Sequence, residues 1–458
     1  MQSFNFKAMQ VYFSEGNTLS YAFRKKQLQL LYEAIKIHET AILQALYEDL
    51  HKSNEEAFAT EVGFVYSEIK HVLTHLENWM MPQKVSTPII LQPSTSWVQR
   101  DPLGVTCIIA PWNYPFQLVM APLIGAIAGG NCAVIKPSEY TPNTASIIET
   151  IIRETFSPNY ITTCLGDGTV IVSSLLEQNR FDHIFFTGST TVGKIIAKLA
   201  AEKLTTTTLE LGGKSPCIVD ETAHIATAAK RIVFGKFTNA GQTCVAPDYL
   251  LVHVSVYEKL LEALIKSIEL FYGKDASVAN DYGRIVNTKR FEVLCSYLKQ
   301  GSLLYGGKVD AHSRYISPTL MAIDKHQLDF SIMKEEIFGP ILPIIVYEKE
   351  AEVLSIIQSN PNPLSLYLFS QNTKKQDFFA KNIAFGGGCI NNTLVHLANP
   401  NLPFGGLGNS GVGQYHGKYT FETFTRPKGI LKTATWVDLR IKYPPYKGML
   451  PFLRWFMK

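Results

Sequence analysis

Apolar side chains recur at helical spacing near the start of the chain. Six of them fall on one stripe of residues 26–50: Leu28, Leu31, Ile35, Ile42, Leu43 and Leu46. This period predicts an amphipathic helix that packs one face on a core. A second helix, with more charged residues, is predicted for residues 54–80.

From about residue 101 the pattern becomes regular, with short strand-like runs that alternate with helical segments. The runs, read as strands, are residues 104–110, 132–138, 160–166, 181–188 and 205–213. The segments between them, read as helices, are 118–130, 141–156 (with Thr141 as cap), 169–178 and 190–204. Strands buried on both faces and alternating with helices predict a doubly wound parallel sheet in an α/β fold. Such a sheet binds ligands beyond the carboxyl ends of its strands.

A similar alternation resumes after Glu221 and predicts a second α/β domain on another sheet. The helices are expected at 222–236 and 256–273 and the strands at 249–255, 340–348 and 363–370, with a further segment of the same kind at 283–301. Residues 83–100 predict a projecting hairpin around a Pro-Ser-Thr turn, and a late strand is expected within 428–439. Together these two segments predict a small arm between subunits.

The composition narrows the functional class. The chain has 458 residues, 46% hydrophobic and 18% charged, which is typical of a globular protein. A net charge of +4 without a dense basic block argues against nucleic-acid binding. Residues 102–135 carry no charge, but several prolines and asparagines interrupt them, which favours a buried strand–loop–helix–strand over a membrane span. No signal peptide is expected at the N-terminus.

The cysteines point to a reducing compartment. There are seven of them, without a CxxC pair, and no local metal site is predicted. Cys107, Cys132 and Cys217 lie in apolar runs and are expected to be buried. Cys244 differs, because it lies in the polar run FTNAGQTCVAPD, which predicts a flexible loop that presents the thiol. A catalytic thiol usually needs a histidine, and the nearest, His253, is expected in a strand, so a thiol hydrolase remains an open alternative.

Two strand ends carry residues suited to a dinucleotide. In FFTGSTTVGK, Gly188 ends a strand and Gly193 lies in the first turn of a helix, where backbone amides suit a pyrophosphate, although a simple tight turn explains the glycines equally well. In VIKPSE, Lys136 and Glu139 leave the same sheet edge, and a carboxylate there can accept bonds from ribose hydroxyls. The alternative for that pair is a solvated loop.

Two further polar residues interrupt apolar surroundings. Glu210 lies between two leucines in LELGGKSP, and burial would raise its pKa, as suits a general base. If it faces solvent instead, its position gives no indication of a catalytic role. Asn113 in PWNYPF follows the first strand of the parallel sheet, where its amide is a candidate oxyanion donor. The neighbouring Trp112 is expected in the core.

Seven motifs occur together in one order: PWNYP, KPSE, FTGSTTVG, LELGGKSP, NAGQTC, EEIFGP and LPFGGLGNSGVG. This set resembles the aldehyde dehydrogenase superfamily over residues of about 20 to 428. The strings GQTCVAPDY and YHGKYTFETF, the closing YPPY and the short length resemble a class 3-like bacterial member.

The resemblance implies a reaction and its residues. Cys244 would attack the aldehyde, Asn113 and the Cys244 backbone N–H would hold the oxyanion, and Glu210 would activate the water that hydrolyses the thioester. NAD would be the cofactor, and NADP could be accepted as well. Its proposed contacts are Lys136, Glu139, Gly188, Ser189, Gly193, Glu336 and Phe338. An apolar entrance would be lined by Tyr114, Leu118, Phe234 and Phe404, which favours medium- or long-chain aliphatic or aromatic aldehydes, with a polyene aldehyde also allowed.

The same resemblance implies an organisation and a setting. The dinucleotide-binding, Rossmann-like domain would comprise residues 1–82 and 101–208, and the catalytic domain 209–395. The arm would comprise 83–100 and 428–440, followed by a C-terminal tail at 441–458, with a return segment at the domain interface at 396–427. A cytoplasmic homodimer is expected, and the tail GMLPFLRWFMK could contact a membrane surface or pack on a partner subunit.

Two other functions stay open at this point. A coenzyme A-acylating dehydrogenase generally lacks the glutamate base, so Glu210 argues against it. A catalytically silent binding or structural protein should tolerate loss of a catalytic side chain, and all are present.

Overall fold

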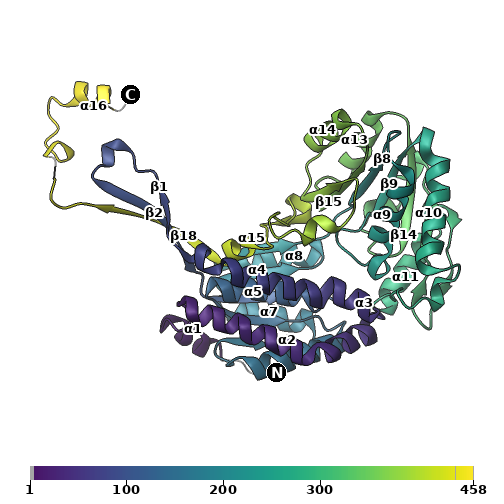
Figure 1. Cartoon of the computed structure of the whole chain (residues 1–458), viewed down its shortest axis with the longest axis horizontal. Coiled ribbons are helices and arrows are strands. Elements are labelled where there is room, and N and C mark those ends of the chain that lie inside the picture. The colour runs from purple at the N-terminus through teal and green to yellow at the C-terminus, as the bar shows by residue number, and fades with distance from the viewer. Residues whose placement is uncertain (1–4, 439, 457–458) are drawn as a thin grey trace. The chain divides into compact units, whose positions relative to one another are not determined.

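The computed structural model describes residues 5–438 and 440–456, and Figure 1 shows its helices and strands. The described residues divide into two compact units, the larger made by residues up to Trp79 and Pro102–Thr425, the smaller by Met80–Asp101 and the residues from Arg426 onward. Residues 1–4 of the predicted dinucleotide-binding domain, residue 439 of the predicted arm and residues 457–458 of the predicted tail lie outside the described residues.

The N-terminal helices follow the predicted pattern with one interruption. After α1 (Phe6–Ser14), helix α2 (Tyr21–Leu50) confirms the predicted amphipathic helix, and Leu28, Leu31 and Ile35 on its stripe are fully buried. The helix predicted for residues 54–80 is instead three pieces: α3 (Asn54–Ala57), a π-helical turn η1 (Phe58–Val62) and α4 (Gly63–Met80). A π turn is rare and occurs often at functional sites.

The larger unit contains the predicted parallel sheet. Its six strands run in the order β17-β7-β6-β3-β4-β5, and all neighbouring pairs are parallel except β17–β7. The strands are β3 (Val105–Ile109), β4 (Cys132–Lys136), β5 (Ile161–Thr163), β6 (His183–Thr187), β7 (Thr206–Glu210) and β17 (Gly411–Val412). The helices between them are α5 (Gln117–Gly129), α6 (Pro142–Thr155), α7 (Gly168–Gln178) and α8 (Thr190–Glu202). Each predicted strand and helix of this region is therefore present, with ends that differ by a few residues.

The cap predicted for α6 is confirmed in its position, but it does not use the Thr141 side chain. Thr141 precedes α6, but its buried hydroxyl has no hydrogen-bond partner among the described residues. The carboxylate of Asp49, from α2, instead accepts from the Thr144 N–H at 2.8 Å and the Thr144 hydroxyl at 2.7 Å. A negative charge at a helix N-terminus is stabilising, and a carboxylate so distant in sequence could not be assigned from the local pattern.

The predicted second sheet is present, and it lies in the same compact unit as the first. Its order is β10-β13-β14-β9-β8-β15-β16, parallel except for the β10–β13 pair. The strands are β8 (Pro216–Val219), β9 (Tyr249–His253), β10 (Ser302–Tyr305), β13 (Thr319–Ala322), β14 (Ile341–Tyr347), β15 (Ser365–Phe369) and β16 (Gly387–Ile390). The helices include α9 (Ile225–Phe237), α10 (Tyr257–Tyr272), α11 (Thr288–Tyr297), α13 (Glu350–Gln358) and α14 (Thr373–Asn382).

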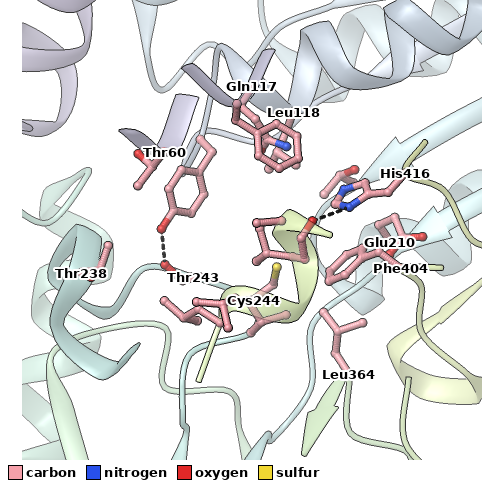
Figure 2. Close-up of a pocket in the computed structure, with 18 of the residues that line it drawn as sticks. Thr60, Gln117, Leu118, Glu210, Thr238, Thr243, Cys244, Leu364, Phe404 and His416 are labelled. Atoms are coloured by element: carbon pink, nitrogen blue, oxygen red, sulfur yellow. Dashed lines mark hydrogen bonds between the residues drawn. The ribbon is translucent and has the colours of Figure 1, made fainter. Parts of the chain in front are cut away.

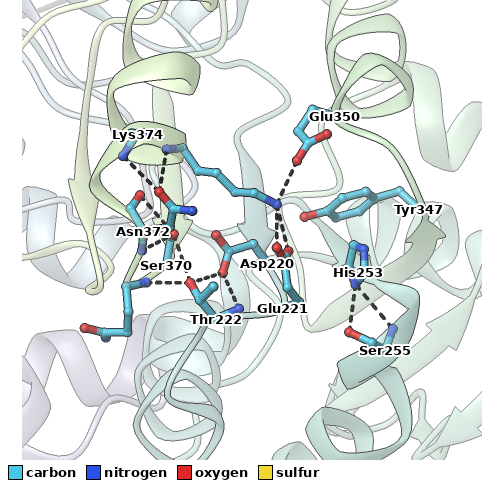
Figure 3. Close-up of polar contacts among 12 residues, drawn as sticks. Asp220, Glu221, Thr222, His253, Ser255, Tyr347, Glu350, Ser370, Asn372 and Lys374 are labelled. Carbon is cyan, nitrogen blue, oxygen red and sulfur yellow. Dashed lines mark hydrogen bonds and ion pairs between the residues drawn. The ribbon is translucent and has the colours of Figure 1, made fainter.

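The carboxyl edge of this second sheet carries a network of ion pairs and hydrogen bonds (Figure 3). The ammonium of Lys375 lies 2.7 Å from a carboxylate oxygen of Glu221 and 2.7 Å from one of Glu350. The side chain of Asp220, directly after β8, accepts from the Thr222 N–H at 2.8 Å. These contacts tie together the segments that follow β8, β14 and β15.

The smaller unit contains the predicted hairpin and late strand, but the predicted Pro-Ser-Thr turn is wrong, because Ser94 and Thr95 begin β2 and residues 86–93 make the connection. Strands β1 (Gln83–Val85), β2 (Ser94–Pro102) and β18 (Thr425–Thr433) form a three-stranded sheet in the order β1-β2-β18. The unit also contains a short tail helix, α16 (Leu450–Phe456). Among the described residues, no helix combines the length and the apolar character needed to cross a bilayer.

Candidate active site

Two cavities of the larger unit meet at one pair of reactive side chains. A cavity of about 290 Å³ and another of about 570 Å³ share four wall residues: Thr187, Glu210, Leu211 and Cys244. Figure 2 shows the sulfur of Cys244 among the side chains of the smaller cavity, with Glu210 also in its wall. A group held between the two cavities would therefore contact both the thiol and the carboxylate.

The two reactive side chains come from opposite edges of the two sheets. Glu210 is the last residue of β7, and its register partner Thr187 is the last residue of β6, so both lie at the carboxyl edge of the first sheet. Cys244 lies in the connection between α9 and β9, which enters the second sheet at its amino edge. The rule that ligands bind at carboxyl edges thus holds for one sheet of this site and not for the other.

The segment before Cys244 is buried and strained, so the predicted flexible loop is wrong, whereas the predicted presentation of the thiol agrees with a partly exposed Cys244. Asn239, Ala240 and Gly241 all have positive φ, and a side chain at Gly241 would lie 2.3 Å from the carbonyl oxygen of Gly339. Left-handed backbone at a residue with a side chain costs about 1 kcal/mol or more.

Side-chain amides hold this segment in the interior. The fully buried Gln242 donates to the carbonyls of Asn239 at 3.1 Å and Arg284 at 3.0 Å, and accepts from the Val286 N–H at 3.0 Å. The polar composition therefore serves internal hydrogen bonds and not solvent contact.

Asn113 adjoins the cysteine segment. Its side-chain Nδ2 donates to the carbonyl of Gln242 at 3.0 Å, and its side chain lies in the wall of the larger cavity. An amide nitrogen has two N–H donors, so one remains for a reacting oxygen. The backbone carbonyl of Asn113 accepts from Asn239 at 2.7 Å and from Lys52 at 3.0 Å.

Burial and neighbouring carboxylates disfavour charge on both reactive groups. Burial, followed by the charges of Glu336 and Glu210, raises the pKa of Cys244 to about 12, and the N–H groups of Cys244 and Val245 oppose this. Burial also raises the pKa of Glu210 well above its ordinary value, and neither carboxylate oxygen has a hydrogen-bond partner among the described residues. Ionisable groups that line a cavity and have strongly shifted pKa values are typical of catalytic sites.

The larger cavity suits a dinucleotide. Four of the predicted cofactor residues lie in its wall: Gly188, Ser189, Glu336 and Phe338. Gly188 and Ser189 lead into the N-terminus of α8, where backbone N–H groups favour a phosphate. Burial, followed by the charge of Asp248, raises the pKa of Glu336 to about 8, and its Oε1 lacks a partner among the described residues. An orphaned carboxylate oxygen beside such a helix end fits the hydroxyls of a ribose, so the residues present fit NAD(P).

The other three predicted cofactor residues are not in this wall. A side chain at Gly193 would lie 2.5 Å from Leu211, so this glycine allows α8 to pack closely on the end of the sheet. Lys136 donates to Glu139 at 2.9 Å, and Glu139 accepts from the Gly168 N–H at 3.0 Å. Burial would raise the pKa of Glu139, but these hydrogen bonds hold it below its ordinary value.

Some residues of the larger cavity were missed by sequence reasoning. Arg290 and Lys334 lie in its wall without belonging to a motif that could have identified them. Trp112, expected in the core, also lines it, and its ring is 5.3 Å from that of Phe338 in an edge-to-face arrangement.

The smaller cavity is mainly apolar and includes all four predicted entrance residues: Tyr114, Leu118, Phe234 and Phe404. Its wall also contains residues that sequence reasoning did not identify: Phe64, Gln117, Leu364, Leu394, Leu397, Tyr415 and His416. Figure 2 shows several of these side chains around the thiol. Burial lowers the pKa of His416 to about 4, so its ring is neutral at pH 7. The cavity is therefore suited to an uncharged apolar group.

Comparisons with known proteins place this geometry in a family. The sequence profile of the aldehyde dehydrogenase family matches residues 5–430. The chain is 50% identical over 449 residues to 4,4'-diaponeurosporen-aldehyde dehydrogenase of Staphylococcus aureus, covering 98% of this chain and 97% of that protein. It is 41% identical over 436 residues to the dimeric NADP-preferring aldehyde dehydrogenase of Canis lupus familiaris, covering 94% and 95%. The solved substrate-bound state of Staphylococcus aureus AldH superimposes with a TM-score of 0.96 at 49% identity, covering 99% of this chain and 98% of that one.

Proposed function

The chain belongs to the aldehyde dehydrogenase family, and from this premise we propose how its residues carry out the NAD(P)-dependent oxidation of an aldehyde. The observation that carries the proposal is that Cys244 and Glu210 lie in the walls of both cavities. An aldehyde that enters through the apolar cavity then has its carbonyl carbon at the junction with the cofactor cavity.

The first half of the reaction belongs to Cys244 and Asn113. The Cys244 thiol loses its proton to solvent, and the thiolate sulfur then attacks the carbonyl carbon, which gives a tetrahedral thiohemiacetal with a negatively charged oxygen. The Asn113 amide and the Cys244 backbone N–H hold its oxygen, and each such donor is worth about 2.7–4 kcal/mol in a transition state. NAD(P), when bound, supplies the acceptor for the hydride that leaves this carbon.

The second half belongs to Glu210. Loss of the hydride leaves a thioester on Cys244, which a water molecule hydrolyses to the carboxylate. Glu210 takes a proton from that water, since its free oxygens face the same junction. A histidine is not required, because the leaving thiolate needs no proton before it departs.

Cofactor preference is proposed to depend on Lys136 and Glu139. The carboxylate of Glu139 suits a free 2′-hydroxyl, whereas Lys136, now paired with it at 2.9 Å, offers a cation for a 2′-phosphate. We therefore propose that both NAD and NADP are accepted. We also propose that the cofactor-binding domain comprises residues 1–82 and 101–208 and that the catalytic domain comprises residues 209–395.

The proposed substrates are long apolar aldehydes, because the smaller cavity is formed mainly by aromatic and aliphatic side chains. The name of the Staphylococcus aureus relative gives 4,4'-diaponeurosporen-aldehyde as the aldehyde that it oxidises. Each methylene moved from water into such a cavity is worth about 0.8 kcal/mol, so kcat/KM should rise roughly fourfold per methylene until the cavity is filled.

A panel of straight-chain aldehydes from acetaldehyde to dodecanal, each with NAD and with NADP, tests this proposal. Reduced cofactor should form without added coenzyme A, and kcat/KM should increase along the series with either cofactor. A flat series would contradict the apolar assignment of the cavity, and strict dependence on coenzyme A would instead favour an acylating dehydrogenase.

The smaller unit is proposed to serve assembly and surface contact in a cytoplasmic homodimer. In its tail helix Leu450 and Trp455 are 57% and 76% exposed, and Arg454 lies between apolar residues, a combination that suits a lipid interface. Analytical ultracentrifugation should show a dimer, and the full chain should float with anionic lipid vesicles at low salt. Flotation lost on removal of residues 447–458 would assign the contact to the tail, and no flotation of the full chain would rule it out.

A further inference from the structure

A buried ion pair lies directly behind the oxyanion donor and has no part in the reaction described above. Lys52 and Glu61 are both fully buried, with Nζ and Oε1 2.5 Å apart. Removing two charges from water costs several kcal/mol per ion, which attraction alone often fails to repay. We propose that Lys52 and Glu61 are positioning residues that hold the Asn113 amide in its reacting geometry, an inference that rests on the proposed role of Asn113.

The ammonium of Lys52 is aimed at the backbone that carries Asn113. Besides Glu61, it donates to the Asn113 carbonyl at 3.0 Å and lies 4.1 Å from the centre of the Tyr114 ring. The Lys52 ammonium thus directs its N–H groups to the Glu61 side chain, the Asn113 carbonyl and the Tyr114 ring. Movement of the Asn113 peptide would therefore break a charge-assisted hydrogen bond in a buried site.

Glu61 fixes the other end of the same segment. Its Oε1 receives Lys52, and its Oε2 accepts from the N–H groups of Phe116 at 2.8 Å and Gln117 at 3.2 Å, at the N-terminus of α5. Glu61 lies in the π turn η1, between α3 and α4, and its carboxylate is fully buried. The segment from Asn113 to Gln117 is thus held by one carboxylate and one ammonium.

The same segment is joined to the cysteine loop on its far side. Asn239 donates to the Asn113 carbonyl at 2.7 Å, and the Tyr114 hydroxyl lies 2.7 Å from that of Thr243. The Asn113 amide is therefore placed between two rigid supports, the ion pair and the loop that carries Cys244. Preorganisation of this kind determines how much a donor contributes to a transition state.

A double-mutant cycle in the full chain tests the inference. Asn113→Ala alone should lower the single-turnover rate of NADH formation by about 100- to 1,000-fold. Lys52→Met alone should lower it by about 10- to 100-fold, the scale of loss for a misplaced reacting group, with little change in KM. In the Asn113→Ala background, Lys52→Met should cost less than about twofold, because the group that it positions is already absent. The same loss in both backgrounds would overturn the inference.

Further variants separate positioning from stability. Lys52→Met leaves Glu61 as an unpaired buried carboxylate, so Lys52→Met/Glu61→Gln should recover much of the unfolding midpoint while the turnover loss persists. Full recovery of turnover in that double variant would also overturn the inference. Arg24→Met is the matched control, because Arg24 is buried and donates to the Thr18 and Ala128 carbonyls but does not contact the site. It should lower stability and leave the single-turnover rate nearly unchanged.

The cycle also separates the oxyanion role of Asn113 from the positioning role of Lys52. No loss in Asn113→Ala would remove the oxyanion role itself and with it the basis of the inference. A large loss in Asn113→Ala together with additive behaviour of Lys52→Met would leave the proposed function intact and reject only the positioning role.

Discussion

Replacement of Cys244 by alanine is expected to lower kcat for aldehyde oxidation by roughly 10⁴-fold or more, the scale seen when a covalent nucleophile is removed from an enzyme. Alanine cannot form the thiohemiacetal, and a planar carbonyl is a poor hydride donor. Cofactor affinity should change little, because Cys244 lies only at the end of the larger cavity. Steady-state rates and calorimetric titration with NAD would measure the two effects.

The matched control is Cys295→Ala. Cys295 is a partly exposed thiol on α11 and lies in the wall of neither cavity. It should retain wild-type turnover. Substantial turnover in Cys244→Ala would place the nucleophile elsewhere and contradict the reaction proposed above.

The raised pKa of Cys244 gives this prediction a pH dependence. With a pKa of about 12, the thiol of the cofactor-free enzyme is protonated at pH 7, and the reactive thiolate increases as pH rises. Alkylation of Cys244 by iodoacetamide should therefore accelerate by about tenfold per pH unit between neutral and moderately alkaline pH. A plateau below pH 8 would show that the site already stabilises the thiolate without cofactor.

The order of sheets and helices could be predicted from sequence because it depends on local periodicity. The runs that became β3, β4 and β6 are mainly apolar over a strand length and fully buried, as expected for strands of a parallel sheet. The identity of Cys244, Glu210 and Asn113 as candidates also came from local contrast, a polar or reactive side chain in unexpected surroundings. The resemblance of the motifs to one enzyme family then indicated that these three residues act in one reaction.

What sequence reasoning missed depends on contacts between distant segments. The Asp49 carboxylate caps a helix about ninety residues later, and no local pattern predicts that pairing. Asn239 and Gln242 read as a solvated polar run because their partners, such as Arg284, lie far along the chain. The π turn at Phe58–Val62 has no simple sequence pattern, and its Glu61 accepts from the N–H groups of Phe116 and Gln117, which lie 55 and 56 residues later.

The site therefore combines two kinds of support. Strand ends of a regular sheet place Glu210 and the residues around the cofactor cavity, whereas an irregular, strained segment places Cys244. A strained segment persists only if surrounding contacts over-determine it. The amides of Asn239 and Gln242 and the buried charges around Asn113 supply those contacts, which explains why so many polar groups are buried near one thiol.

Replacement of Glu210 by glutamine is expected to slow turnover without abolishing the first half of the reaction. Glu210 is proposed to act only after the thioester has formed, so Glu210→Gln should lower kcat by about 10²- to 10⁴-fold, the range for a general base. The first turnover should survive as a burst of about one NADH per active site, because deacylation becomes rate-limiting. Rapid-mixing absorbance would show the burst, and mass spectrometry should detect the acyl group on Cys244.

The pH dependence of kcat provides the decisive comparison, and its sign follows from the burial of Glu210. A general base acts only when ionised, and burial raises the pKa of this carboxyl well above its ordinary value. Wild-type kcat should therefore still increase with pH well above the range in which an ordinary glutamate ionises, and Glu210→Gln should lose that increase. The exposed Glu202 offers a matched control, since Glu202→Gln removes a carboxylate at the end of α8 and should preserve both the rate and its pH dependence. If Glu210→Gln instead abolished the burst, the carboxylate would have to act before hydride transfer, most simply by taking the proton of the Cys244 thiol.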